Sequence, residues 1–275
     1  MRFGKGEPEE RRRRDCCALC SKSKDQVKKL IVGLHGAVCD ECIHLIMDIL
    51  EAEGSLTPDL SSSDLQDEVC WANIQLRRQG LVTMHSGNVS ALDIETGIVL
   101  IKPSGVDYES LLATKIVQVN LETGEPLPNQ MKPSVDLPHH LFLYRNIPEI
   151  KAIVHTHSNF ATAFAACHKP IPCVLTAIAD EFGGEIPCAP YVDNEGDHIG
   201  EAILKHRSRG PAILLGNHGV FAWGPSVKDA LKAAIMVEDV ARTATLAMRI
   251  GEPIPISQVE TEKWWDRYHN RYGQS

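Results

Sequence analysis

Two Cys-x-x-Cys pairs near the N-terminus constrain the fold of this chain more than any other feature. Cys17 and Cys20 form the first pair, and Cys39 and Cys42 form the second after eighteen intervening residues. This spacing is typical of a structural zinc site, in which four thiolates complete a closed tetrahedron around one ion. A segment of roughly 40 residues is too short to fold reliably on its own core, so we expect zinc to supply its folding free energy.

Small, polar and turn-forming residues follow this cysteine segment. They predict a division into a C4 zinc-binding domain at residues 1–54, a flexible linker at 55–64 and a larger domain at 65–275. In the larger domain, helical patterns alternate with short apolar runs that predict strands near residues 98–101, 116–121, 152–154 and 212–215. The clearest helix begins at a Ser226 cap and ends before Gly251. The predicted class of the larger domain is therefore α/β.

Charge and hydropathy exclude several classes of partner. The 28 basic and 36 acidic residues give a net charge of -8, which argues against binding to nucleic acid. No apolar stretch is long enough to span a membrane, and the N-terminus lacks the apolar core of a signal peptide. Cysteines outside the two pairs are scattered, as expected in a reducing compartment. We therefore expect a cytoplasmic protein with no nucleic-acid and no membrane partner.

Three histidines form a candidate metal site in the larger domain. His155 and His157 follow an apolar run at positions i and i+2, so their side chains point to the same face of a strand. His218 lies in a glycine-flanked turn between two further apolar runs, which can bring it opposite that pair. Three neutral imidazoles with an open position are typical of a catalytic zinc that polarises a carbonyl or enediolate. An isolated His-x-His pair is more often a pair of ordinary strand histidines than a pair of metal ligands. The neighbouring motifs therefore decide whether these histidines are interpreted as a metal site.

The N-terminal motifs resemble the zinc-binding domain of the unfoldase ClpX. Cys17-x-x-Cys20-x-Lys-Ser, Val27-Lys-Lys-Leu-Ile31 and Cys39-Asp-Glu-Cys42 carry this resemblance, which spans about residues 15–53. It implies a small treble-clef-like C4 domain that dimerises and docks a protein partner. The chain contains no GxxxxGK[ST] phosphate loop, which excludes unfoldase activity. The following helix carries an apolar stripe that comprises Ile43, Ile46, Met47 and Leu50. This stripe has two interpretations, as the core of the module or as a self-association face.

Five ordered motifs make residues 66–274 similar to the class II aldolase and L-ribulose-5-phosphate 4-epimerase family. They are Gly87-Asn-Val-Ser90, Lys102-Pro-Ser-Gly105, Pro133-Ser-Val-Asp136, His155-Thr-His157 and the segment from His218 to Gly224. The resemblance implies a central β-sheet flanked by helices and a homotetramer with active sites between subunits. It further implies a phosphorylated ketose as substrate and a divalent metal, Zn²⁺ or another such as Mn²⁺, held by His155, His157 and His218.

The same resemblance implies roles for further residues. Asp136 stands where related fuculose-phosphate aldolases carry a metal-binding glutamate, which favours the epimerase branch and an acid/base role for this carboxylate. The alternative for Asp136 is a helix N-cap or a turn residue. Asp180 and Tyr272 would assist catalysis, with Tyr272 reaching a neighbouring subunit's site. The implied phosphate pocket comprises Gly87, Asn88, Ser104, Gly105 and Ser134. For each glycine the alternative is a plain turn.

Two positions depart from the family pattern. Val135 replaces a serine that would offer phosphate one more hydrogen bond, and Trp264 or Trp265 occupies the place of a frequent histidine. The predicted activity is conversion of L-ribulose 5-phosphate to D-xylulose 5-phosphate by retro-aldol cleavage and re-addition. The alternatives are a class II aldolase of the fuculose-phosphate type that releases an aldehyde, and a catalytically idle scaffold that recruits a partner through the zinc module.

Overall fold

The computed structural model of the chain describes residues 15–33, 36–52 and 65–271. The chain divides into two compact units, residues 1–63 and residues 64–275, and each is considered by itself. The predicted linker at residues 55–64 and the predicted catalytic residue Tyr272 lie outside the described residues.

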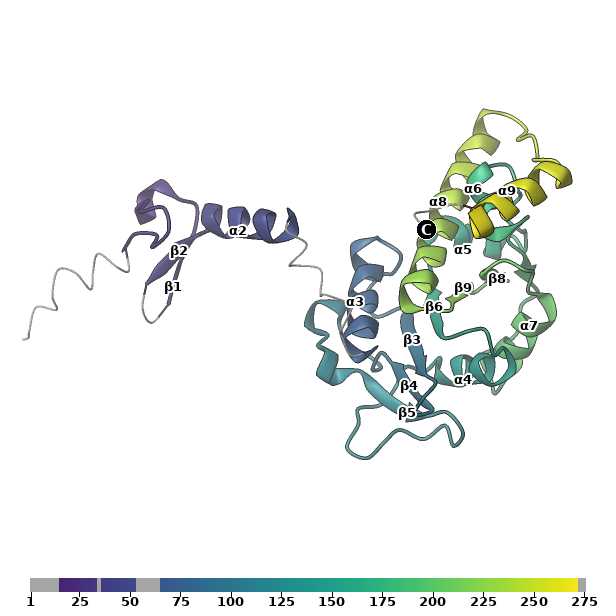
Figure 1. The fold of residues 1–275 in the computed structure, drawn as a ribbon, viewed down its shortest axis with the longest axis horizontal. Helices are drawn as coiled ribbons and strands as arrows, with labels where there is room; N and C mark the ends of the chain where they lie inside the picture. The colour runs from purple at the N-terminus through teal and green to yellow at the C-terminus, as the bar shows by residue number, and fades with distance from the viewer. Residues whose placement is uncertain (1–14, 34–35, 53–64, 272–275) are drawn as a thin grey trace, which may run out of the picture. The chain divides into compact units, whose positions relative to one another are not determined.

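The first unit is built around the two cysteine pairs. Its elements are η1 (Lys24–Gln26), β1 (Leu30–Val32), β2 (Ala37–Cys39) and α2 (Asp40–Ala52) (Figure 1). Strands β1 and β2 pair antiparallel, with Leu30 opposite Cys39. The core of this unit consists of buried cysteines with only a few apolar neighbours. A cysteine turn, a hairpin and a helix follow one another as in the predicted treble-clef-like domain, and so small a core is consistent with folding that depends on zinc.

The second unit contains a seven-stranded mixed sheet. Its order is β5-β4-β3-β6-β9-β8-β7, and every neighbouring pair is antiparallel except β7 and β8. The strands are β3 (Asn88–Asp93), β4 (Ile98–Ile101), β5 (Val117–Asn120), β6 (Ala152–Thr156), β7 (Cys188–Ala189), β8 (Ala212–Leu215) and β9 (Gly219–Gly224). The four apolar runs predicted as strands form β4, β5, β6 and β8, and the predicted α/β class is confirmed.

Helices cover both faces of this sheet. They are α3 (Leu65–Arg78), α4 (Leu137–Asn146), α5 (Asn159–Ala166), α6 (Thr176–Phe182), α7 (His198–His206), α8 (Val227–Ile250) and α9 (Gln258–Arg271), with short 3-10 turns η2 (Tyr108–Ser110) and η3 (Ala113–Lys115). Helix α8 begins as predicted, because the Ser226 hydroxyl accepts the Asp229 N–H at 3.2 Å, and it ends at Gly251. Among the described residues, no helix combines the length and apolar character that crossing a bilayer requires.

Two apolar cores, one on each face, fix the centre of the sheet. Side chains alternate along β6, so that Val154 packs into the core with α3, α5 and α8, whereas Ile153 packs into the core with α4 and α7. Strand β9 alternates in the same way through Val220 and Phe221. Strands β6 and β9 are therefore buried on both faces, and they give rigid support to the histidines at their ends (Figure 1).

Candidate metal centre and active site

His155 is the most rigidly held of the three histidines. It lies in β6, is 1% exposed, and is paired with Asn88 of β3 and Phe221 of β9. Its Nδ1–H donates to the Val220 carbonyl at 2.9 Å, and its ring stacks on Phe221 with centroids 4.4 Å apart. Because Nδ1 carries the proton in this bond, Nε2 keeps a free lone pair for a cation. Burial lowers the pKa of His155 to about 3, so the imidazole is neutral.

His157 and His218 complete the group. Their rings lie 5.2 Å apart and 4.7 and 4.9 Å from the His155 ring. His218 is in the turn between β8 and β9, where Asn217 has a positive φ of 56°. Gly219 allows this turn to approach β6, since a Cβ at this position would lie 2.5 Å from the Thr156 carbonyl oxygen and 2.6 Å from Cδ2 of His157. Residues of two distant segments are thereby brought to one point.

This group fits a divalent cation. One ligand atom from each histidine can be chosen so that all three lie within 4.8 Å of one another. Nδ1 of His218 is buried without a hydrogen-bond partner among the described residues. Burial lowers the pKa of both His157 and His218, and the proximity of His157 lowers that of His218 further, which favours the neutral, ligating form. The donor set of three imidazoles suits zinc or another divalent transition metal.

Asp136 lies beside this group in a network with Asn88 and Ser134. Asn88 Nδ2 donates to the Asp136 carboxylate at 2.6 Å and to the Ser134 hydroxyl at 3.0 Å. Burial acts to raise the pKa of Asp136, but His155 and the Asn88 hydrogen bond outweigh it, so the pKa lies below its usual value. Asp136 directly precedes α4, yet its side chain makes no capping hydrogen bond. The interpretation of Asp136 as a helix cap therefore lacks the hydrogen bond that defines a cap.

The predicted phosphate-pocket residues lie along neighbouring segments. Ser104 N–H donates to the Lys132 carbonyl at 2.9 Å, which places Ser104 and Gly105 alongside the segment that leads to Ser134. Gly87, with a φ of 79°, precedes Asn88, and a Cβ there would lie 2.7 Å from the His155 carbonyl oxygen. The Tyr108 hydroxyl donates to the Gly87 carbonyl at 2.7 Å and thus holds this loop against η2.

Two buried polar residues near the site were not singled out from the sequence. Lys102 is 2% exposed, its Nζ lies 4.8 Å from the Tyr108 ring centroid, and it forms no ion pair among the described residues. Burial lowers its pKa, and Asp107 opposes that effect. His140 is fully buried and its Nδ1 lies 2.7 Å from the Ser90 hydroxyl. For Lys102 a signal was present, because it is the first residue of the Lys102-Pro-Ser-Gly105 motif that carries the family resemblance.

Asp180 occupies a different part of this unit. It lies on α6, which packs against α9, and its carbonyl accepts a hydrogen bond from His269 Nε2 at 3.1 Å. Burial raises the pKa of its carboxyl group, against the opposing effect of Arg267. Within one chain, the metal-ligand group comprises the three histidines and not Asp180. The acid/base roles of Asp180 and Tyr272 stay predictions.

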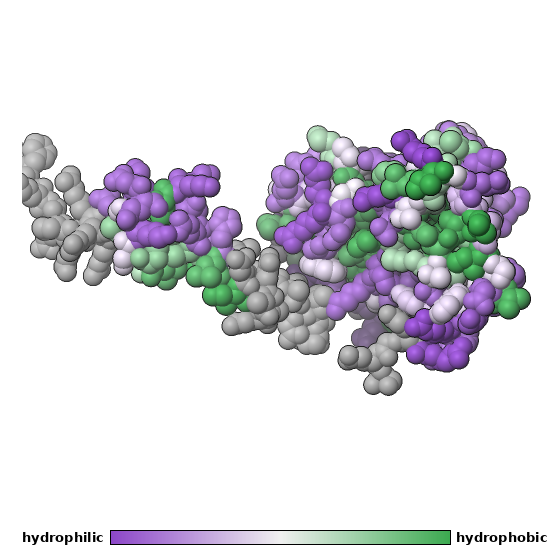
Figure 2. Space-filling model, turned by 90° about the horizontal axis from the view of Figure 1, so that it is seen from above, coloured by the Kyte–Doolittle hydropathy of each residue, from purple (hydrophilic) through white to green (hydrophobic). Residues whose placement is uncertain are grey.

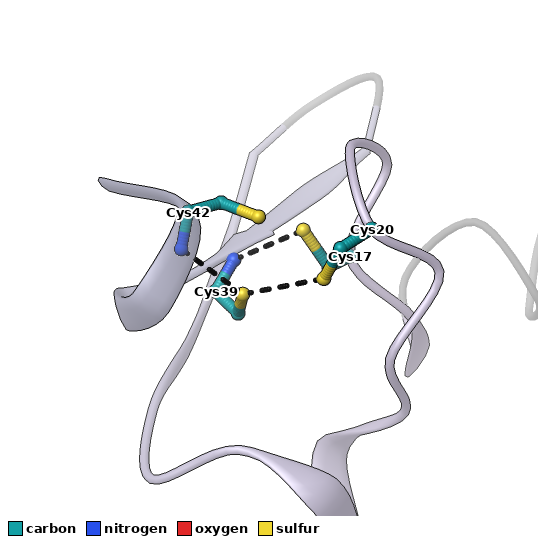
Figure 3. Close-up of side chains that lie close together, drawn as sticks. All are labelled: Cys17, Cys20, Cys39 and Cys42. Carbon is teal, nitrogen blue, oxygen red and sulfur yellow. Dashed lines mark hydrogen bonds between the residues drawn. The ribbon is translucent and has the colours of Figure 1, made fainter. Parts of the chain in front are cut away.

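The cysteine cluster of the first unit forms a second metal centre. The four sulfur atoms lie within 4.8 Å of one another and face inward from the N-terminal turn, β2 and the start of α2 (Figure 3). The Cys39 N–H donates to the Cys17 sulfur and the Cys42 N–H to the Cys39 sulfur, both at 3.4 Å. Backbone hydrogen bonds, foremost from Cys20, lower the pKa of Cys17 to about 6. Such a cluster fits a closed zinc site with no position for a substrate.

The fold and the three-histidine group define a metal-binding protein of the class II aldolase type. Residues 67–245 match the family model for the Class II Aldolase and Adducin N-terminal domain, and residues 15–52 match that for the ClpX C4-type zinc finger. The chain therefore belongs to the class II aldolase family and carries a C4 zinc finger of the ClpX type, as the sequence motifs predicted.

Curated and solved relatives of this chain are epimerases and aldolases. L-ribulose-5-phosphate 4-epimerase UlaF of Salmonella paratyphi B is 39% identical over 228 residues, which cover 76% of this chain and 98% of that protein. The structure of an L-fuculose 1-phosphate aldolase is 27% identical with a TM-score of 0.68, covering 75% and 97% of the two chains. YgbL of Klebsiella pneumoniae is 29% identical with a TM-score of 0.62, covering 73% and 97%. The match to solved aldolases confirms the predicted class II aldolase-like fold.

Proposed function

We propose that this protein is a metal-dependent 4-epimerase that interconverts L-ribulose 5-phosphate and D-xylulose 5-phosphate. The supporting observation is the convergence of His155, His157 and His218 beside the Asp136 carboxylate, in a chain 39% identical to UlaF. Zn²⁺ or Mn²⁺ held by these three imidazoles supplies Lewis-acid polarisation of a ketose carbonyl. The zinc of the cysteine cluster is structural.

Asp136 is the proposed acid/base group. The neighbouring His155 and His140 and the Asn88 hydrogen bond hold the pKa of its carboxyl group below the usual value, so the ionised form can accept the proton of the C4 hydroxyl. The C3–C4 bond then breaks to give the enediolate of dihydroxyacetone and glycolaldehyde phosphate. Rotation of the aldehyde presents its other face, and re-formation of the bond inverts C4. Tyr272, which would reach the site from a neighbouring subunit, is proposed to exchange the proton on the opposite face, and Asp180 is proposed to assist.

The phosphate of the substrate is proposed to bind at the edge formed by the Gly87 loop and the segments around Ser104 and Ser134. Backbone N–H groups and small hydroxyls there can approach phosphate oxygens closely. Buried Lys102 would add a positive charge near this edge; it forms no ion pair among the described residues, and the nearby charge of Asp107 favours its protonated form. Val135 is 71% exposed, so the side chain that replaces the family's serine lies at the surface.

The resemblance also supports a homotetramer. Among the described residues of the second unit, Ile250, Ile254 and Val259 are 90%, 86% and 76% exposed, and apolar side chains are visible over its surface in Figure 2. We propose that subunit contacts cover such residues. In the first unit, Ile46 of the apolar stripe on α2 is 40% exposed, which favours a self-association face over a purely internal stripe. The side chains of Met47 and Leu50 lie outside the described part of the chain.

A coupled assay for D-xylulose 5-phosphate on the metal-loaded full chain tests this proposal. Epimerisation predicts xylulose phosphate from L-ribulose 5-phosphate without accumulation of free two-carbon or three-carbon fragments. Accumulating glycolaldehyde phosphate would instead identify an aldolase. No turnover of either kind, with the metal bound, would refute the catalytic proposal and favour the idle scaffold.

A further inference from the structure

A buried carboxylate from α8 holds the start of α5, the helix that follows the metal-binding histidines. Glu238 is 5% exposed and lies 77 or more residues along the chain from its partners. Its two oxygens accept the N–H of Phe160 at 3.0 and 3.1 Å, and one of them accepts the N–H of Ala161 at 3.0 Å. These N–H groups belong to the first turn of α5, where the helix dipole favours a negative charge.

The residue expected to cap α5 does not do so. Ser158 occupies the N-cap position, but its side chain makes no capping hydrogen bond, and its buried hydroxyl has no partner among the described residues. N-terminal N–H groups of a helix are normally satisfied by the side chain at the cap. Here Glu238 satisfies them from another helix, and it thereby ties the chain directly after His157 to the long helix α8.

His157 is a metal-binding histidine whose own side chain is not held by a hydrogen bond. It lies one residue beyond β6, it is more exposed to solvent than His155, and no side-chain hydrogen bond holds its ring among the described residues. His155, in contrast, is fixed by two strand neighbours and by the bond of its Nδ1 to Val220. The placement of His157 therefore depends on its backbone, which is anchored by the end of β6 before it and by the start of α5 after it.

We propose that Glu238 is a positioning residue that fixes the backbone of His157 for metal binding. Its carboxylate does not touch the metal or the substrate and acts through the first turn of α5. Substitution of residues that orient metal ligands from outside typically costs 10-fold to 100-fold in metal affinity. This inference rests on the metal site of the proposed function, but it does not depend on which sugar is converted.

Titration of Co²⁺ into the full chain, followed by visible absorption, tests this role. Co²⁺ bound by imidazoles lacks the thiolate charge-transfer bands of Co²⁺ in the cysteine cluster, so the two sites are distinguishable. We expect Glu238→Gln to weaken binding at the histidine site at least tenfold and to alter its ligand-field spectrum, because the amide N–H₂ group opposes the N–H groups of α5. Glu238→Asp, which keeps the charge but is one methylene shorter, should also weaken binding and serves if Glu238→Gln does not fold.

Ser226→Ala is the matched control, since it removes the N-cap of the same helix α8, twelve residues before Glu238. Loss of this cap should lower the stability of the protein, and we expect unchanged Co²⁺ affinity and spectrum in that variant. Wild-type affinity in the Glu238 variants, or an equal loss in Ser226→Ala, would overturn the inference. Absence of a histidine-type Co²⁺ spectrum in the wild-type chain would refute the metal site itself, and with it both proposals.

Discussion

Replacing Asn88 by alanine probes how the site controls its proposed acid/base group. Asn88 Nδ2 donates to the Asp136 carboxylate at 2.6 Å, and it is 1% exposed, so water does not readily substitute for it. A hydrogen bond to a charged group contributes about 1.5–3 kcal/mol. Since 1.36 kcal/mol corresponds to one pKa unit, loss of this bond should raise the pKa of Asp136 by roughly one to two units.

The assay is the pH dependence of kcat/KM for the epimerase reaction. Asp136 must be ionised to accept a proton, and a higher pKa means that it becomes protonated at higher pH. The acidic limb of the profile should therefore move to higher pH in Asn88→Ala by roughly one to two units.

Asn73→Ala is the matched control for this prediction. Asn73 is also fully buried, bonding to the carbonyls of Val69 and Val89 at 2.8 and 3.2 Å and accepting the Val89 N–H at 2.9 Å. It makes no hydrogen bond to Asp136 among the described residues. Its loss should lower stability and leave the acidic limb in place. An unmoved limb in Asn88→Ala, or the same shift in both variants, would refute the reasoning.

The remaining predictions concern packing and protonation. Gly219→Ala should lower stability by about 1–3 kcal/mol through overpacking and weaken metal binding through displacement of His157, whereas Gly251→Ala, in open space, should do neither. Thermal unfolding and metal titration measure both effects, and intact metal affinity in Gly219→Ala would contradict the close approach. The pKa of His140 and of metal-free His155 is lowered by burial to about 3, so the unfolded chain binds more protons and stability should fall as pH decreases from 6.5 towards 3. The slope is about 1.4 kcal/mol per pH unit for each group. Equal unfolding free energies of the metal-free protein at pH 7 and 5 would count against this.

Local patterns predicted most of the elements and pointed to the three candidate metal-binding histidines, because each signal is confined to a few neighbouring residues. Ser226 and Gly251 bracket α8, and the apolar run that leads to His155 and His157 forms strand β6. A single two-residue strand such as β7 (Cys188–Ala189) has no pattern of its own, since it exists only by pairing with β8. The prediction for Asp136 left two roles open, because the sequence around an aspartate that precedes a helix is the same whether or not its carboxylate caps that helix.

Contacts between distant segments could not be predicted from the sequence. The bond between His140 and Ser90 spans 50 residues, and those from Phe160 to Glu238 span 78 residues. Helical spacing places Glu238 on the apolar face of α8, between Ala234 and Ala241, but its partners at the start of α5 follow only from the folded structure. Asp180 was assigned a role through the family resemblance alone, and its position on α6 against α9 leaves that role to experiment.

Metal content and turnover, measured together on three full-length proteins, test the central claim most directly. The wild-type chain should bind two metal ions, one at the histidines and one at the cysteine cluster, and convert L-ribulose 5-phosphate. His155→Ala should keep only the cysteine-bound zinc and lose turnover, whereas Cys17→Ser should keep only the other ion and most of the turnover. Wild-type metal content and turnover in His155→Ala would contradict this account.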